Sequence, residues 1–193
     1  HGIKKILWQI KYKKEKKLEI DCLKACELIV PQNSDNVNLL AEEGIARNKM
    51  DHIVPYFNNM KRCARKSNKK DILFFGAMSR PENYLSAIWF IENVFAKLII
   101  DDSEYKLYLV GNKPMTELRD IAEQYSPNIV LTGWVPETDT YFRKCDISIV
   151  PVFEGTGAKI KVLESIGKSI PTICSSFAAK DYDVNDELII ADN

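Results

Sequence analysis

From residue 71 to the end of the sequence, short aliphatic runs alternate with longer segments whose apolar residues recur at helical spacing. We expect strands at 71–76, 105–110, 128–132, 146–152, 171–175 and 187–190, and helices at 82–98, 115–125, 138–144 and 158–167. Such alternation favours a parallel sheet whose right-handed crossovers place helices on both faces. The sequence therefore predicts an α/β domain with a Rossmann-like sheet.

Glycine follows four of these expected strands, at Gly76, at Gly111, at Gly133 and in the loop 154–157. The carboxyl ends of parallel strands meet at one edge of the sheet, and ligands of such sheets bind just beyond that edge. We therefore expect four loops to converge on one rim and to form a binding site there.

The segment from Asp146 to Ser176 is predicted to form a strand, a glycine loop, a helix and a second strand. Free backbone N–H groups and the positive end of the dipole make the start of such a helix suitable for a phosphate. Lys159 and Lys161 add charge in the first helical turns, and Glu164 follows Lys161 by about one turn on nearly the same face. A carboxylate there can accept hydrogen bonds from the two hydroxyls of a ribose.

A glycine loop between a strand and a helix is common in α/β proteins, so this pattern alone does not establish a phosphate site. Lysines in a first helical turn oppose the dipole, however, and need another reason to be there. Anion-binding and diol-binding groups are spaced as a nucleoside diphosphate requires. A nucleotide site is therefore the main interpretation, and an ordinary loop is the alternative.

The run Glu154-Gly-Thr-Gly-Ala-Lys-Ile-Lys-Val-Leu-Glu164 resembles the donor-site segment of retaining glycosyltransferases of the GT-B fold, family 4, also called glycosyl transferases group 1. Three flanking stretches are similar to strand ends of the C-terminal domain of these enzymes: Phe74–Ser79, Leu109–Gly111 and Leu131–Val135. In that family the C-terminal domain binds a sugar nucleotide, whereas the acceptor binds on an N-terminal domain. The resemblance extends over residues 71–193 and, weakly, over residues 20–60.

The resemblance implies a donor-binding role for residues at the rim, namely Gly76, Arg80, Gly133, Trp134, Val135, Thr156, Gly157, Ala158, Lys161 and Glu164. The amides of residues 156–158 would bind the distal phosphate, Lys161 would neutralise it, and Glu164 would hold the ribose. Glu154 and Lys161 are implied as the catalytic residues, with Glu154 contacting hydroxyls of the donor sugar. Nine residues lie between Glu154 and Glu164, more than in the commonest form of the motif.

The stretch after the third expected strand has two interpretations. The resemblance implies that Trp134 and Val135 pack against the nucleobase and read its edge, whereas the alternative is a buried tryptophan that fills the core. Thr138 and Asp139 begin the next helix, and we expect them to be caps.

The loop after the first expected strand departs from the wider family, which has an arginine and a lysine there. This sequence has Ala77 and Asn83 near those places. We expect either that Arg80 and Lys161 supply the positive charge instead, or that donor binding is weaker.

Residues 3–26 are predicted to form a helix with an apolar stripe and five lysines between positions 11 and 17. A strand is expected at 28–31, a helix at 35–43 with Ser34 as its N-cap, and a strand at 53–57. This order resembles the end of a GT-B N-terminal domain. We therefore assign residues 1–58 to the end of that domain, 59–70 to a basic linker and 71–193 to the C-terminal sugar-nucleotide domain. We expect most of the N-terminal domain to be missing from this chain, and the chain alone to be inactive.

Charge is distributed unevenly along the chain. Residues 1–70 contain 16 Lys and Arg against 8 Asp and Glu, a balance of +8, whereas residues 71–193 contain 11 against 19, a balance of −8. A cationic amphipathic helix at 3–26 can lie on an anionic bilayer, pack on a neighbouring protein surface, or simply be solvated. The basic segment 61–70 lacks interleaved aromatic residues, which argues against a nucleic-acid site.

Metal-binding and secreted proteins are disfavoured. The five cysteines are scattered without zinc-ligand spacing, so we expect reduced thiols and no metal site. Asp181 and Asp183 are not expected to bind a metal, because GT-B enzymes hold the diphosphate with a helix dipole and a lysine; no cofactor is expected. We find no apolar run of about 20 residues and no secretory signal, and expect a cytoplasmic protein, either free or at the inner face of the membrane.

The main hypothesis is a glycosyltransferase of the hexosyltransferase type that acts in polysaccharide biosynthesis. It would move a sugar, with retention, from a nucleoside diphosphate to a glycan or lipid-linked acceptor. Its partners would be the sugar nucleotide, the acceptor and, through residues 3–26, the membrane surface, but not nucleic acid. One alternative is a non-catalytic α/β module that docks on a partner or membrane through its basic helix, and another is a GT-B epimerase or phosphorylase-like enzyme.

Overall fold

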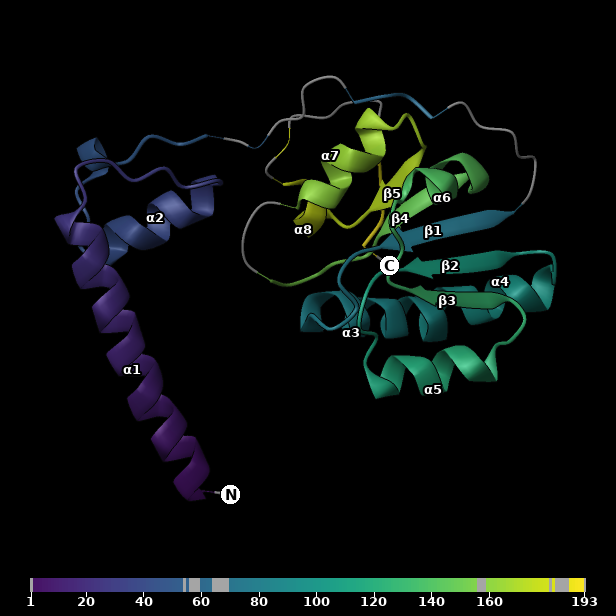
Figure 1. Ribbon diagram of the computed structural model, residues 1–193, viewed down its shortest axis with the longest axis horizontal. Helices are drawn as coiled ribbons and strands as arrows, with labels where there is room; N and C mark the ends of the chain where they lie inside the picture. Colours follow the sequence, from purple (N-terminus) through teal and green to yellow (C-terminus); the bar gives the residue numbers. More distant parts are fainter. Residues whose placement is uncertain are drawn as a thin grey trace. The chain divides into compact units, whose positions relative to one another are not determined.

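The computed structural model of the chain describes residues 2–53, 55, 60–63, 70–155, 159–180, 182 and 188–192, without the side chain of Ile3. The chain divides into two compact units, His1–Pro55 and Tyr56–Asn193, and each is described by itself (Figure 1). The assignment of 1–58, 59–70 and 71–193 to particular domains of a GT-B enzyme remains a prediction.

The first unit contains the helices α1 (Gly2–Ala25) and α2 (Ser34–Glu42) and the 3₁₀ turn η1 (Arg47–Lys49). Both helices predicted in this region are confirmed. The predicted N-cap is wrong, because the Asn33 side chain accepts a hydrogen bond from the Asn36 amide at 2.8 Å and Ser34 is already helical. Asparagine and serine cap helices about equally well, so the local sequence could not separate the two positions.

The strands predicted at 28–31 and 53–57 are not found in the described part of these segments. Ile29 and Met50 instead form one isolated parallel bridge. Pro31 has no N–H group to donate, so it adds only its carbonyl, which accepts a hydrogen bond from the Ile53 amide at 3.1 Å. Part of the second predicted strand lies outside the described residues.

The second unit is built on one sheet of six strands. In chain order they are β1 (Asp71–Phe75), β2 (Lys106–Val110), β3 (Ile129–Gly133), β4 (Ile147–Val150), β5 (Thr172–Cys174) and β6 (Leu188–Ile190). Their order across the sheet is β3-β2-β1-β4-β5-β6, and every neighbouring pair is parallel. The predicted Rossmann-like sheet is confirmed. The strand order reverses at β1 and β4, which is where such sheets bind their ligands.

Helices cover both faces of the sheet (Figure 1). One face carries α3 (Pro81–Phe90), the π-helical segment η2 (Ile91–Phe95), α4 (Ala96–Asp101) and α5 (Thr116–Gln124). The other face carries α6 (Asp139–Lys144), α7 (Ile160–Gly167) and α8 (Ser176–Ala179). All helices predicted after residue 71 are present. The one that was not predicted, α8, is only four residues long and therefore has no detectable period.

Alternate residues of the strands fill a separate core on each face. Phe74 points to the α3 side, where it packs with the fully buried Ile91 and Phe95. Its neighbour Leu73 points to the opposite side, where it packs with Phe142 of α6. Strands buried on both faces carry continuous apolar runs, which explains why β1 was recognisable in the sequence.

The continuous helix Pro81–Asp101 is long and apolar enough, by length and composition alone, to cross a membrane, with a mean hydropathy of 1.2. This finding corrects the expectation that the chain lacks such a segment, since Glu92 and Lys97 interrupt the run without ending it. The buried side chains of Ile91 and Phe95 pack in the core against the sheet. We therefore interpret it as a core helix of the α/β unit.

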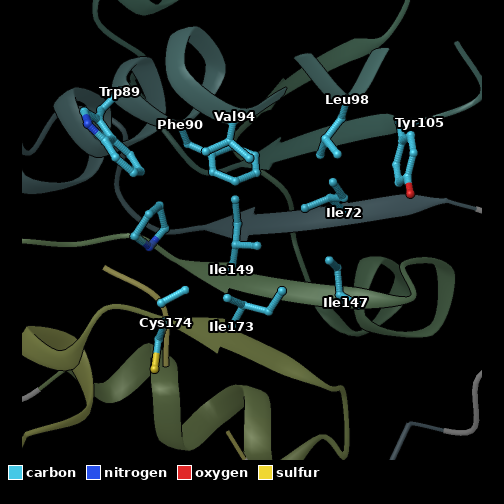
Figure 2. A pocket seen from close by; sticks show the side chains of 12 residues that line it. Ile72, Trp89, Phe90, Val94, Leu98, Tyr105, Ile147, Ile149, Ile173 and Cys174 are labelled. Carbon is cyan, nitrogen blue, oxygen red and sulfur yellow. The ribbon is translucent and has the colours of Figure 1, made fainter. Parts of the chain in front are cut away.

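An apolar cavity of about 350 Å³ lies between this helix and strands β1, β4 and β5 (Figure 2). Its walls are Ile72, Trp89, Phe90, Val94, Leu98, Tyr105, Ile147, Ile149, Pro151, Ile173, Cys174 and Ala191. Ile149 and Ile173 line it from adjacent strands, on which they are in register. Because none of these described lining residues is charged, the cavity offers nothing that would hold a diphosphate.

Candidate functional site

The loops that follow β1, β2 and β3 are tied together at the carboxyl edge of the sheet. The Gly76 amide donates to the Val110 carbonyl at 2.9 Å, and the Gly111 amide donates to the Gly133 carbonyl at 3.1 Å. A Cβ at Gly111 would lie 1.7 Å from the carbonyl oxygen of Gly76, so no side chain fits there. These three loops converge on one rim, as the sequence predicted.

A cavity of about 220 Å³ opens at this rim, beside the start of α3 and the start of α7. Its lining residues are Gly76, Ala77, Arg80, Glu82, Asn83, Val152, Lys159, Ile160 and Lys161. Three of these side chains are cationic and one is anionic. The lining therefore favours an anionic ligand.

The Lys161 side chain is partly exposed as a whole, but its ammonium group is enclosed by protein. Nζ donates a hydrogen bond to Asn83 Oδ1 and lies 5.1 Å from the centroid of the Phe74 ring. Burial lowers the pKa of Lys161 to about 8; the Glu82 carboxylate opposes this shift, and the charges of Arg80 and Lys159 add to it. An ammonium with little water around it attracts an anion more strongly than a hydrated one does.

Arg80 and Glu82 form an ion pair at the mouth of the cavity, with 2.6 Å between Nη2 and Oε1. The Arg80 side chain is 60% exposed, so its guanidinium is accessible to a ligand. Glu82 lies against the loop after β4, because a Cβ on Gly155 would be 3.2 Å from the Glu82 Cβ. In the same loop Lys159 donates to the Gly155 carbonyl at 3.3 Å.

Glu164 lies on α7 beside the start of α6. It is half-buried, and its Oε1 accepts a hydrogen bond from Thr138 Oγ1 at 3.5 Å. Burial raises the pKa of the Glu164 carboxyl, against the opposing effects of Lys168 and of the Thr138 hydroxyl. Because α6 follows the loop after β3, the carboxylate lies towards the rim, although it is not among the residues that line the 220 Å³ cavity.

Thr138 and Asp139 do not cap α6 as predicted, since the Thr138 N-cap makes no side-chain cap hydrogen bond. Thr138 contacts α7 and Asp139 contacts the residue that caps the C-terminus of α7. Thr138 donates to Glu164, and Asp139 Oδ1 pairs with Lys168 Nζ at 2.5 Å. Tertiary contacts with a neighbouring helix thus replace the local capping role.

The remaining predicted residues lie along the rim, outside the cavity lining. Gly133 ends β3 with φ +69°, and Trp134 is 72% exposed, which excludes the alternative that this tryptophan fills the core. Val135 packs against the core on the α6 side. Glu154 is exposed in the loop after β4. The predicted phosphate-binding residues 156–158 lie outside the described residues.

The cavity lining brings together three predicted site residues, Gly76, Arg80 and Lys161. Sequence reasoning gave no role to Glu82 and Asn83, which also line it. The only signal in the sequence was that Asn83 stands near the place of a lysine in the wider family. Its contact with Lys161 spans 78 positions, and no local pattern reveals a contact of that range.

Metal ligands are not gathered in the described part of the chain, where no group of three or more His, Cys, Asp or Glu could hold an ion. The five cysteines are free thiols. Asp181 and Asp183, which were not expected to bind a metal, lie outside the described residues.

The sequence profile of the family described as Glycosyl transferases group 1 matches residues 69–193. The chain belongs to this family. A curated relative, an uncharacterized 44.6 kDa protein in the cps region of Klebsiella pneumoniae, is 25% identical over an alignment of 132 residues. The match covers 64% of this chain and 34% of the relative. The chain thus spans about a third of the length of that relative.

Solved glycosyltransferase structures share the fold of this family member. A mutant of Staphylococcus aureus TarM, in complex with fondaparinux, α-GlcNAc-glycerol and UDP, has a TM-score of 0.74 at 13% identity over 93% of this chain and 37% of TarM. Anabaena HepE in complex with UDP-glucose has a TM-score of 0.64 at 12% identity over 90% of this chain and 53% of HepE. WaaG, which is involved in lipopolysaccharide biosynthesis, has a TM-score of 0.62 at 11% identity over 78% of this chain and 46% of WaaG. At these identities the likeness shows the GT-B fold and no more.

Proposed function

We propose that this chain binds the diphosphate of a sugar nucleotide in the 220 Å³ cavity and forms part of a retaining glycosyltransferase of family 4. The observation that carries the proposal is the enclosed ammonium of Lys161, which faces an anion-sized cavity at the strand-order reversal of a family member. A partly desolvated cation that makes no ion pair with a described Asp or Glu is costly without a ligand, and a diphosphate offsets that cost.

In the transfer step, the bond between the sugar C1 and the diphosphate oxygen breaks, and its electron pair stays on that oxygen. The acceptor hydroxyl forms the new bond to C1 on the same face and passes its proton to an oxygen of the leaving diphosphate. Lys161, Arg80 and the amides of residues 156–158 stabilise the charge that develops on the leaving diphosphate, which is preorganised electrostatic catalysis. Glu154 contacts hydroxyls of the donor sugar.

The rest of the donor extends along the rim. Glu164 holds the ribose, since its carboxylate already accepts one hydroxyl hydrogen bond, from Thr138. Gly133, Trp134 and Val135 form the nucleobase side, where the exposed Trp134 ring offers a surface for stacking.

The comparisons support a uridine nucleotide as the first ligand to test, because TarM and HepE are described in complex with UDP or UDP-glucose. They also support a hexosyl transfer to a glycan or lipid-linked acceptor in polysaccharide biosynthesis, given WaaG and the relative in a cps region. The chain would act in the cytoplasm without a metal or other cofactor. UDP affinity is then expected to be the same with and without EDTA.

Calorimetric titration of UDP and GDP into the chain tests the proposal. We expect Lys161→Met and Glu164→Ala each to weaken binding of the preferred nucleotide by about tenfold or more, which corresponds to one charge-assisted hydrogen bond. Lys97→Met, which removes an exposed lysine of α4, is the matched control and should bind as the wild type does. Equal affinity for the wild type and both site variants refutes the assignment.

Contact with an anionic membrane is a second candidate function, favoured by α1. This helix exposes apolar side chains among its lysines, including Ile6, Leu7, Trp8 and Ile10, each more than half exposed. Flotation with vesicles of phosphatidylglycerol and phosphatidylcholine is expected to recover the wild type, and to lose a variant with Lys13→Glu and Lys17→Glu. Vesicles of phosphatidylcholine alone are the control. Equal recovery of both proteins on both vesicles contradicts an electrostatic membrane contact.

A further inference from the structure

Asn83 is a buried amide in the first turn of α3, only 5% exposed, and it joins the two sides of the cavity. Its Nδ2 donates to the Ala77 carbonyl at 2.9 Å, and its Oδ1 accepts from the Lys161 ammonium. It is the one neutral side chain with hydrogen-bonding groups among the described residues of the lining.

The chemistry of the two partners fixes which way the amide points. The Ala77 carbonyl can only accept a hydrogen bond, so it must face the NH₂ end of Asn83. The Lys161 ammonium can only donate, so it must face the oxygen end. The amide therefore cannot flip without losing both bonds.

The neutrality of Asn83 matters for the charge of the site. A carboxylate at this position would cancel the Lys161 charge, whereas an amide oxygen holds the ammonium and leaves its charge available. Within the described residues, Lys161 makes no ion pair with Asp or Glu, and the nearby Glu82 is paired with Arg80. The groups that act electrostatically on Lys161 are Glu82 and Arg80 at the start of α3 and Lys159 before α7.

Gly76 makes room for this arrangement. A Cβ at Gly76 would lie 3.0 Å from Asn83 Nδ2 and 3.2 Å from Lys161 Nζ. Both distances are shorter than ordinary contacts, so a side chain at Gly76 would push the amide and the ammonium out of place. The absence of a side chain at Gly76 thus leaves room for the contact between Asn83 and Lys161.

We propose that Asn83 is a positioning residue: it holds the Lys161 ammonium where it can contact the diphosphate of the donor, and it does so without neutralising the positive charge. The inference rests on the proposed function. It concerns a residue that touches Lys161 and acts on the ligand through it.

The test compares Asn83→Asp and Asn83→Ala with the wild type by UDP titration between pH 6.5 and pH 9.5. Asn83→Asp places a carboxylate beside Lys161, and Asn83→Ala removes the hydrogen-bond acceptor. Both are expected to weaken UDP binding at pH 7 by about tenfold, the value of one charge-assisted bond. Asn93→Asp makes the same chemical change at an exposed position ten residues along and should bind as the wild type does.

The shape of the pH profile separates positioning from a merely structural role. Wild-type affinity should decline above about pH 8, where Lys161 loses its proton. The decline should move to higher pH in Asn83→Asp and to lower pH in Asn83→Ala. Weaker binding with an unshifted profile, or wild-type affinity in both variants, overturns the inference.

An NMR titration of the lysine side chains in the nucleotide-free chain keeps this result separate from the proposed function. The titration of Lys161, assigned with Lys161→Met, should move up in pH in Asn83→Asp. If it moves and the wild type binds no nucleoside diphosphate, the contact stands, while the proposed function and the role of Asn83 in it are refuted. If it does not move, the inference is refuted whatever the chain binds.

Discussion

Lys161 makes the stability of this protein depend on alkaline pH in a way that can be calculated. Its pKa is lowered from the ordinary value of 10.5 to about 8, so between these values the unfolded chain binds a proton that the folded chain does not. Stability therefore rises with pH in this window. The full shift corresponds to about 3 kcal/mol, and integration from pH 7 to pH 9.5 gives about 2 kcal/mol.

The variant Lys161→Met isolates this effect, because methionine has a similar volume and does not titrate. Urea unfolding of both proteins, followed at several pH values under reducing conditions, gives the free energy of unfolding of each. The wild type should gain about 2 kcal/mol relative to the variant between pH 7 and pH 9.5. Any constant cost of leaving Asn83 Oδ1 unpaired cancels in this comparison. A difference that does not change with pH shows that the ammonium is hydrated in the folded protein, and refutes the argument for an enclosed cation.

Three further changes test other contacts. Gly111→Ala should destabilise the chain by about 3 kcal/mol, because the new Cβ would meet the Gly76 carbonyl. Gly133→Ala has open space around its Cβ and should cost only about 1 kcal/mol, for its positive φ. Thermal melts of the two variants compare these costs. Ser165→Ala should cost about 1 to 3 kcal/mol in urea unfolding, because it leaves the buried Ser148 hydroxyl without its partner at 2.9 Å, and adding Ser148→Ala should recover part of that loss. Burial raises the pKa of Glu164, so the wild type should lose stability relative to Glu164→Gln as the pH rises from about 4 to 7, and an unchanged difference in unfolding free energy contradicts this.

The sheet was predictable because its strands have both faces covered. Leu73 and Phe74 point to opposite cores, so β1 is apolar at consecutive positions and stands out between polar segments. The segment around Ile29 carries a similar short apolar run but forms only one bridge, with Met50. Length and composition do not distinguish these cases: in β1 the run is paired with a strand on each side and covered on both faces, whereas Leu28 and Val30 on either side of Ile29 are exposed.

The candidate site was predictable only where its residues are close in sequence to a recognisable loop. Lys161 follows the glycine loop after β4, and Gly76 directly follows a strand, so each could be placed at the rim. Thr138 and Asp139 looked like caps because that role depends on local sequence alone. Their actual partners, Glu164 on α7 and Lys168 at its C-cap, are distant in sequence, and a local rule cannot include them.

Asn83 shows why a departure from a family pattern is not the same as a loss of function. Judged by sequence, the absence of a lysine there removes a cation from the donor site. In the fold, the amide supports the cation that remains, whereas a lysine in its place has no acceptor to offer the Lys161 ammonium. Like charges close to each other lower each other's pKa, so the second cation would add less than a full charge near neutral pH. One enclosed, uncancelled lysine with a neutral partner can therefore serve an anion as well as two that compete for protons.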